Sequence, residues 1–240
     1  MELMKELARK YETVDFLDGD PSWFMHQVEG DDNKETLAFI ASCLSYGSRK
    51  QFFPKIQYIL DCSHGEVYDW VSRGRFENDI PDRNECYYRL YTFSLMNRFL
   101  KAYQGLILGH GSLGGYLQAR NVTVALTAVE MITSYFASRG IDVIVPKNAK
   151  SSCKRVCMFL RWMVRDNSPV DLGLWKFIDK RTLIMPMDTH VVQEACAMGL
   201  LKSKSTSMAS ARKLTERMAE FFPDDPTKGD FALFGYGVNK

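Results

Sequence analysis

The sequence lacks any stretch that could cross a membrane. No segment of its 240 residues approaches the run of about eighteen apolar residues that a membrane-spanning helix requires. The first residues, MELMKELARKYETVDFL, alternate charged and apolar side chains and contain no cleavage-like site, so they lack the pattern of a signal peptide. Repeats and low-complexity tracts are also missing, while 46% of the residues are hydrophobic. We therefore expect a globular protein that does not bind a membrane.

A strong net charge and the familiar catalytic motifs are absent as well. The 31 basic and 29 acidic side chains nearly cancel, so the net charge of +2 says little about partners. No H-E-x-x-H, Walker-type or G-x-S-x-G motif occurs, which excludes the easily recognised hydrolase and nucleotide-triphosphatase classes. Six cysteines are scattered along a chain without a secretory pattern, so we expect reduced thiols in a cytoplasmic protein.

The charges that are present are unevenly distributed. Residues 1–36 carry ten acids and four bases, whereas residues 139–165 carry seven bases and a single acid, Asp142. Such a basic segment attracts phosphate groups, although a short basic run is more often simply a solvated helix face. Nucleic acid is therefore one of the partners to consider.

Helical periodicity dominates the sequence. Apolar residues recur on one helix face near residues 37–44 and 95–102, and residues 122–136 are apolar on several sides, as in a helix buried in the core. The one strand-like run is IDVIVP at residues 141–146. These patterns predict an all-α protein, one domain over residues 1–240 with two helical lobes, in which the N-terminal residues can pack with the C-terminal lobe.

A helix predicted to begin near Ser152 has an apolar face and a basic face. The apolar face is formed by Val156, Phe159, Leu160, Met163 and Val164, and the opposite face by Lys154, Met158, Arg161 and Arg165. Lys154 stands first on the basic face, after the loop PKNAKSS. The positive end of the helix dipole at the first turn and the neighbouring Arg155 both disfavour a protonated Lys154. They therefore favour its neutral, nucleophilic amine.

A second informative helix follows Pro186. Asp188 or Thr189 can cap its N-terminus, and Gly199 is placed to end it. Considered alone, Asp188 is explained by this capping role and needs no other function.

These segments together resemble the helix-hairpin-helix DNA glycosylases. The run Pro186-Met187-Asp188-Thr189-His190-Val191, closing with Met198-Gly199-Leu200, is similar to a P-x-D-T-H-V…L-G-L segment of that superfamily. The 34-residue separation of Lys154 from Asp188 resembles the archaeal 8-oxoguanine glycosylase branch, as do the segments ASCLSYG at residues 41–47 and DFALFG at residues 230–235. The chain also resembles an uncharacterised bacterial family that shares CKRxCMFLRWMVR and DFALFGxG.

The resemblance implies a helix-hairpin-helix fold with two helical lobes flanking a cleft and the hairpin near residues 140–165. It implies base excision from damaged double-stranded DNA by a monomer without a cofactor or metal, with 8-oxoguanine as the expected base. Lys154 would attack C1′ and form a Schiff base that permits strand cleavage, and Asp188 would be the essential acid. The expected base pocket consists of Met158, Phe234, Asp230, Trp23 and Ser22. The expected contacts to the DNA backbone are Lys147, Lys150, Ser151, Ser152, Arg155 and Arg161.

The chain departs from the superfamily at the hairpin. The usual glycine-rich hairpin, L-P-G-V-G-x-K-T-A, is replaced by residues 145–154, VPKNAKSSCK, so phosphate binding would depend on lysine and serine side chains. The four-cysteine iron–sulfur motif of endonuclease III-type enzymes is also missing. A non-catalytic nucleic-acid-binding module on the same scaffold is therefore the alternative, although binding alone would require neither Lys154 nor Asp188.

Two other motifs have weaker support. The segment 109–114 matches the dinucleotide-binding pattern G-x-G-x-x-G, with Glu130 as a following acid, but a helical segment precedes it, so we expect a loop between helices. Cys153, Cys157, His190 and Cys196 are possible metal ligands, but their spacing is unlike that of zinc sites.

Overall fold

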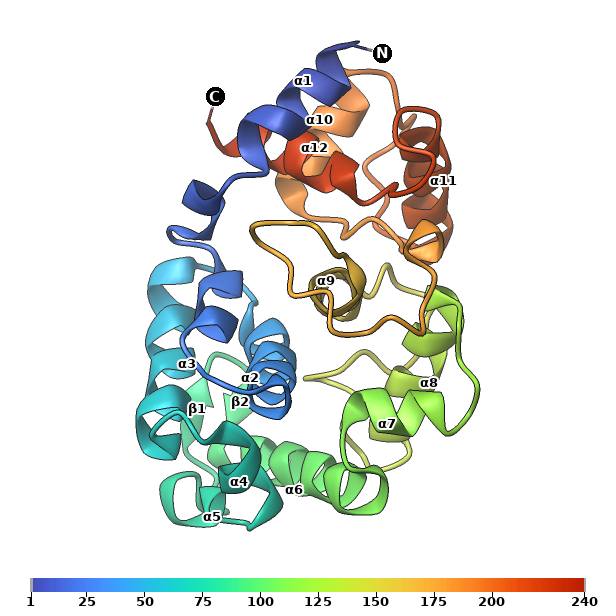
Figure 1. Cartoon of the computed structure of the whole chain (residues 1–240). Helices are drawn as coiled ribbons and strands as arrows, with labels where there is room; N and C mark the ends of the chain where they lie inside the picture. Colours follow the sequence, from blue (N-terminus) through green and yellow to red (C-terminus); the bar gives the residue numbers. More distant parts are fainter. Residues whose placement is uncertain (1, 240) are drawn as a thin grey trace. The chain divides into compact units, whose positions relative to one another are not determined.

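A computed structural model describes residues 2–239, and helices account for most of it (Figure 1). Helix makes up 60% and strand 3% of the structure, which confirms the expectation of an all-α protein. The chain divides into two compact units. We call them the terminal unit (Met1–Asp20, Val122–Glu130 and Asn148–Lys240) and the central unit (Pro21–Asn121 and Met131–Lys147).

The terminal unit brings the two ends of the sequence together. Its elements are α1 (Glu2–Tyr11), η1 (Val14–Leu17), the start of α8 (Ala125–Ala137), α9 (Lys154–Val164), η3 (Lys180–Thr182), α10 (Thr189–Ala197), α11 (Met208–Ala219) and α12 (Lys228–Val238). Helix α12 packs against both α1 and α10 (Figure 1). A glycine permits this approach, because a Cβ atom at Gly235 would lie 2.3 Å from Cγ of Tyr11. The N-terminal helix therefore packs on the C-terminal helix of the same unit.

The central unit has a core of aromatic rings. Its elements are η2 (Pro21–His26), α2 (Asp31–Leu44), α3 (Arg49–Ser63), α4 (Val67–Ser72), α5 (Phe76–Asp79), β1 (Cys86–Tyr88), β2 (Tyr91–Thr92), α6 (Phe93–His110), α7 (Leu113–Gln118) and the end of α8. Phe39 of α2 has its ring centroid 5.0 Å from that of Tyr103 and 5.3 Å from that of Phe136, so α2, α6 and α8 meet in this cluster. The apolar periodicities near residues 37–44, 95–102 and 122–136 thus belong to buried helices, as predicted.

The strand-like run at residues 141–146 does not form a strand. The chain is irregular at Ile141 and Asp142 and forms turns from residue 143 to residue 146. Ile141, Ile144 and Val145 are fully buried there, so their apolar character serves core packing rather than a sheet. Within residues 2–239, the strands β1 and β2 are short and pair antiparallel.

The G-x-G-x-x-G segment joins two helices, as expected. Helix α6 ends at His110 and α7 begins at Leu113, so the strand–turn–helix context of a dinucleotide site is missing. The buried carboxylate of Glu35 accepts hydrogen bonds from the backbone N–H groups of Leu113 (2.7 Å) and Gly114 (3.2 Å). The protein's own anion therefore occupies the N-terminus of α7. No helix within residues 2–239 is both long enough and apolar enough to cross a membrane.

Candidate active site

Lys154 is the first residue of α9, and an unusual backbone conformation precedes it. Cys153, the N-cap residue, has φ 47°, in the left-handed region that side-chain-bearing residues seldom adopt. Its thiol donates to the carbonyl of Asn148 at 3.4 Å, which holds the loop before the helix in place. A non-glycine residue keeps this strained backbone conformation only where the surrounding structure imposes it. Such residues are enriched at active sites and ligand-binding sites.

Asp188 is the N-cap of α10, as the sequence predicts, and it also contacts Lys154. One carboxylate oxygen, Oδ1, accepts from the backbone N–H of His190 at 2.9 Å and so caps the helix. The other, Oδ2, lies 2.5 Å from Nζ of Lys154. The two side chains are 19% and 36% exposed, so the pair lies at the edge of the core and remains in contact with solvent.

The environment of Asp188 favours its ionised form. Burial acts to raise the pKa of this carboxyl, but attraction to Lys154, the hydrogen bond from Lys154 and the N–H of His190 outweigh burial and lower the pKa. A carboxylate 2.5 Å from an amine can orient it and accept its proton. The pair therefore has the geometry for a lysine nucleophile assisted by an acidic residue.

Aromatic side chains pack beside the first turn of α10, which Asp188 caps. The ring of His190, two residues after Asp188, meets the ring of Phe234 edge-on with centroids 6.1 Å apart. Phe16 approaches the same Phe234 ring at 5.8 Å. Met158 lies on α9 one turn after Lys154 and is 9% exposed. Of the expected base-pocket residues, Phe234 is thus joined to the Asp188 helix through His190.

Asp230 is held by an arginine rather than left free. Its carboxylate forms a short ion pair with Arg161, and the two side chains are 8% and 3% exposed. The pKa of Asp230 is raised to about 6, since burial disfavours the charged form more than Arg161 favours it, and the Asp188 carboxylate adds to the increase. The expected hydrogen bond from Asp230 to a DNA base would therefore have to compete with Arg161.

Arg161 and Arg165 share a buried ionic network in the terminal unit. Arg161 also pairs with Asp171 at 3.3 Å, and Arg165 pairs with Asp171 through a short contact. Arg165 further contacts Glu12 at 2.7 Å and Asp225 at 2.8 Å. The Phe231 ring lies against both guanidinium groups, with centroid distances of 4.5 and 5.0 Å. The network ties α9 to the loop after it, to the segment following α1 and to α12.

This network corrects the expectation for Arg161. We expected Arg161 to contact the DNA backbone, but its side chain is 3% exposed and its charge is neutralised by Asp171 and Asp230. A buried, paired guanidinium is not available to a phosphate. On the basic face of α9, Lys154 is therefore the basic side chain that reaches solvent. The arginines of the later turns contact buried carboxylates.

The loop before α9 retains some of the expected phosphate ligands. Lys150 and Ser151 are exposed, and Arg155 is half-buried. Ser152 requires a correction, because it is buried and its backbone N–H donates to the carbonyl of Thr206 at 2.9 Å. Lys147 is exposed and belongs to the central unit.

Two further expected pocket residues belong to the central unit. Ser22 and Trp23 lie in η2, where Ser22 is fully buried and Trp23 is 37% exposed. The Trp23 ring packs edge-on against Phe24 with centroids 5.2 Å apart. Their role in base recognition stays a prediction.

The possible metal ligands do not form a site. Among residues 2–239, no three or more His, Cys, Asp or Glu side chains are arranged to hold a metal ion. Burial raises the pKa of the Cys157 thiol, whose Sγ donates to the carbonyl of Ser152 at 3.4 Å. Cys157 therefore behaves as a core residue beside the loop, and none of the six cysteines, all of which lie within residues 2–239, forms a disulfide.

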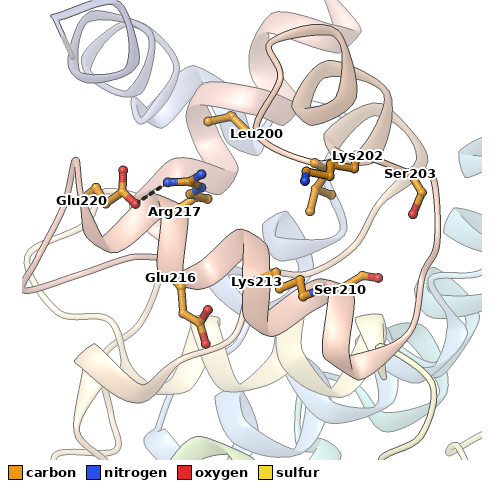
Figure 2. A pocket seen from close by; sticks show the side chains of 9 residues that line it. Leu200, Lys202, Ser203, Ser210, Lys213, Glu216, Arg217 and Glu220 are labelled. Atoms are coloured by element: carbon orange, nitrogen blue, oxygen red, sulfur yellow. Dashed lines mark hydrogen bonds and ion pairs between the residues drawn. The ribbon is translucent and has the colours of Figure 1, made fainter.

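A separate hollow lies beside α11 (Figure 2). Its volume is about 430 Å³, and it is lined by Leu200, Leu201, Lys202, Ser203, Ser210, Lys213, Glu216, Arg217 and Glu220. Neither Lys154 nor Asp188 lines it. The chemistry of the Lys154–Asp188 pair therefore does not explain this feature.

Sequence reasoning missed several residues of the site. The sequence pointed to His190 only within the P-x-D-T-H-V segment and as a possible metal ligand, and no local signal pointed to Asp171 or Glu12 as partners of the arginines. Glu12 meets Arg165 across 153 residues of sequence. Pairing over such separations follows no periodicity.

Comparison with known proteins identifies the family of the chain. A family model described as "Protein of unknown function (DUF2400)" matches residues 20–239. The chain belongs to the DUF2400 family. The match includes Lys154, Asp188 and the whole ionic network except Glu12. No curated protein and no solved structure matched the DUF2400 chain.

Proposed function

We propose that this DUF2400 protein is a DNA N-glycosylase with AP lyase activity, built on a helix-hairpin-helix type of scaffold. The observation that carries the proposal is the contact of Lys154 Nζ with Asp188 Oδ2 at 2.5 Å, with both side chains partly exposed. A lysine at the start of one helix meets an aspartate at the start of another, 34 residues later. This is the pairing that the resemblance to bifunctional glycosylases requires.

The proposed reaction begins at the anomeric carbon of the damaged nucleotide. The C1′–N bond to the base breaks through an oxocarbenium-like state, which the negative charge of Asp188 stabilises. The Lys154 amine forms a bond to C1′ and loses a proton to Asp188, and the departing base nitrogen takes up that proton. Opening of the sugar ring then gives a Schiff base between Lys154 and C1′.

The Schiff base permits strand cleavage. It makes the C2′ hydrogen acidic, so loss of this proton expels the 3′ phosphate by β-elimination. The short Lys154–Asp188 distance supports both steps, because one carboxylate can accept protons from the amine and stabilise positive charge at C1′. Hydrolysis of the Schiff base then releases the protein.

The substrate class is proposed from the resemblance and the nearby side chains. Phe234 and Met158 are the apolar surfaces proposed for the flipped base, and 8-oxoguanine in duplex DNA is the proposed target. The protein would act as a monomer on damaged double-stranded DNA.

A non-catalytic nucleic-acid-binding module is the second candidate. The observation that favours it is the loop before α9, where residues 145–153 contain no glycine and the N–H of Ser152 is bonded within the protein. Binding by such a module would not depend on Lys154 as a nucleophile.

Borohydride trapping distinguishes the two candidates. The protein is incubated with an 8-oxoguanine duplex, an undamaged duplex and duplexes carrying an oxidised pyrimidine or an alkylated purine. A covalent adduct and a nicked strand are expected with 8-oxoguanine and are expected to be lost in Lys154→Gln. Lys176→Gln is the control, because Lys176 is 68% exposed and pairs with Asp166 elsewhere in the terminal unit.

Each outcome decides one part of the proposal. Salt-sensitive DNA binding without an adduct on any duplex would favour the binding module. An adduct that survives in Lys154→Gln would remove Lys154 as the nucleophile. Equal or faster processing of another lesion would overturn the choice of 8-oxoguanine.

A further inference from the structure

A second basic loop lies against the loop that precedes Lys154. It runs from Leu201 to Ser207, with the sequence LKSKSTS, and we call it the 201–207 loop. Ser151 and Ser207 form an isolated antiparallel bridge. Around it, the N–H of Ser152 donates to the carbonyl of Thr206 at 2.9 Å, and the N–H of Met208 donates to the carbonyl of Lys150 at 3.1 Å. Two loops that are about fifty residues apart in sequence therefore form one surface.

This surface carries positive charge that the protein does not neutralise. Residues 202–206 of the loop are all exposed, as are Lys150 and Ser151 beside them. Within residues 2–239, none of Lys150, Lys202 and Lys204 forms an ion pair with an acidic side chain. The contrast with Arg161 and Arg165 is plain, since each of those arginines meets carboxylates of the same unit.

The hollow beside α11 adjoins the same loop. Lys202 and Ser203 of the loop face Ser210 and Lys213 of α11 at one end of it (Figure 2). The acids lie toward the other end, where Glu220 is paired with Arg217 at 2.8 Å. The lysine end therefore offers two ammonium groups and two hydroxyl groups, which suit the oxygens of a phosphate.

We propose that the 201–207 loop, with Lys213 of α11, binds the phosphodiester backbone of DNA next to the excised nucleotide. The inference rests on the proposed glycosylase function, since that function supplies DNA as the partner. Two observations favour DNA as the ligand: the loop is positively charged, and it lies beside the loop that leads to Lys154. Ser151, which bridges to Ser207, precedes Lys154 by three residues. The loop before α9 lacks glycines and has Ser152 buried, and the 201–207 loop adds phosphate ligands to its exposed Lys150 and Ser151.

The test compares DNA binding by the wild-type protein and by Lys202→Ala/Lys204→Ala. Affinity for a 20–30-base-pair duplex is measured by fluorescence anisotropy between 50 and 200 mM salt. The slope of log K against log salt is negative, and each lost phosphate contact reduces its magnitude by about 0.9. The double variant is therefore expected to reduce the magnitude by about 2 and to weaken binding roughly tenfold or more at low salt. Lys202→Arg/Lys204→Arg keeps the charge and is expected to retain the wild-type slope.

Lys5→Ala/Lys176→Ala is the charge-matched control. Both lysines are exposed in the terminal unit and lie outside the 201–207 loop, so this variant is expected to keep the wild-type slope. Circular dichroism of each variant checks that it is folded. Equal slopes in the loop variant and the wild type would overturn the proposal, as would a loss in the control as large as that in the loop variant.

The outcomes also separate this inference from the proposed function. Borohydride trapping of the wild-type protein reports on Lys154 and Asp188, whereas the salt dependence of binding reports on the 201–207 loop. If the wild type is trapped on damaged DNA but the loop variant binds normally, the loop proposal fails and the glycosylase stands. If nothing is trapped but the loop variant binds DNA more weakly, the glycosylase fails and the loop stands. Binding to anionic phospholipid vesicles but not to duplex DNA would contradict the choice of partner.

Discussion

Helix α9 carries two kinds of ion pair at its two ends. At its start, Lys154 and Asp188 pair with each other and are 36% and 19% exposed. Two turns later, Arg161 and Asp230 are 3% and 8% exposed and belong to a network of several charges. The same helix face thus carries a solvent-accessible ion pair at its start and a buried ion pair two turns later. Accessibility allows Lys154 to meet a substrate, while burial limits Arg161 to holding helices together.

The largest effect is expected at the accessible pair. Asp188→Asn removes the negative charge but keeps a good N-cap, because asparagine caps helices about as well as aspartate. We expect excision of the damaged base in single-turnover assays to slow by roughly 10²- to 10⁴-fold, with little change in unfolding. A matched Asp166→Asn variant, which alters a pair elsewhere in the terminal unit, is expected to keep the wild-type rate. A normal rate in Asp188→Asn would show that the carboxylate is not required.

A large stability effect is expected at the sealed pair. Arg161→Met leaves Asp171 and Asp230 buried without this partner, which typically destabilises a protein by about 3–5 kcal/mol. Urea unfolding measures the change. The double variant Arg161→Met/Asp230→Leu removes one of the stranded charges and is expected to recover part of the loss. If Arg161→Met unfolds like the wild type, the network does not hold α9 to α12.

The pH dependence of stability is expected to depend on Asp230. Its pKa is raised from an unfolded value of about 3.9 to about 6, so the wild-type protein loses stability as the pH rises between these two values. Asp230→Asn imitates the protonated form. The stability of this variant relative to the wild type should therefore rise between about pH 4 and pH 6, by up to about 3 kcal/mol, and level off above pH 7.

The lowered pKa of Asp188 acts in a different pH range. Its contribution to stability is present above the unfolded pKa of about 3.9 and is lost only as pH falls through the still lower folded value.

Urea unfolding of the wild type and of Asp230→Asn at several pH values tests the predicted pH dependence for Asp230. Parallel stability curves from pH 4 to pH 7 would mean that Asp230 does not titrate there.

The smallest effect is expected for stability when Lys154 is replaced. Partly exposed ion pairs contribute about 0–1 kcal/mol, and Asp188 keeps its backbone hydrogen bond without Lys154. Lys154→Gln should therefore unfold within about 1 kcal/mol of the wild type while losing borohydride trapping. A loss of stability as large as that of Arg161→Met would remove the distinction between the two ends of α9.

Short-range features of the site could be read from the sequence. Asp188 was predicted as an N-cap, and it accepts from the N–H of His190 two residues later. The helix beginning near Ser152 was predicted from its apolar spacing, and α9 begins at Lys154. Both features depend on residues within one or two turns, so the local sequence contains what is needed.

Exposure along α9 could not be read in the same way. Periodicity correctly placed Lys154, Met158, Arg161 and Arg165 on one face, opposite the apolar residues, but it does not say what covers a face. Carboxylates of Asp171, Asp230 and Glu12 cover its later turns. An ionic face predicted to meet DNA therefore became part of the core, except at Lys154.

The sequence by itself determined the helical class, the boundaries of the helices around Lys154 and Asp188, and the chemical types of those side chains. Each of these follows from interactions between residues close along the chain. The tertiary structure alone decided that Lys154 meets Asp188, that Arg161 is sealed against Asp230, and that the 201–207 loop lies beside the loop before α9. These pairings join residues 34, 69 and 56 positions apart, and only the packing of distant segments determines which of them touch.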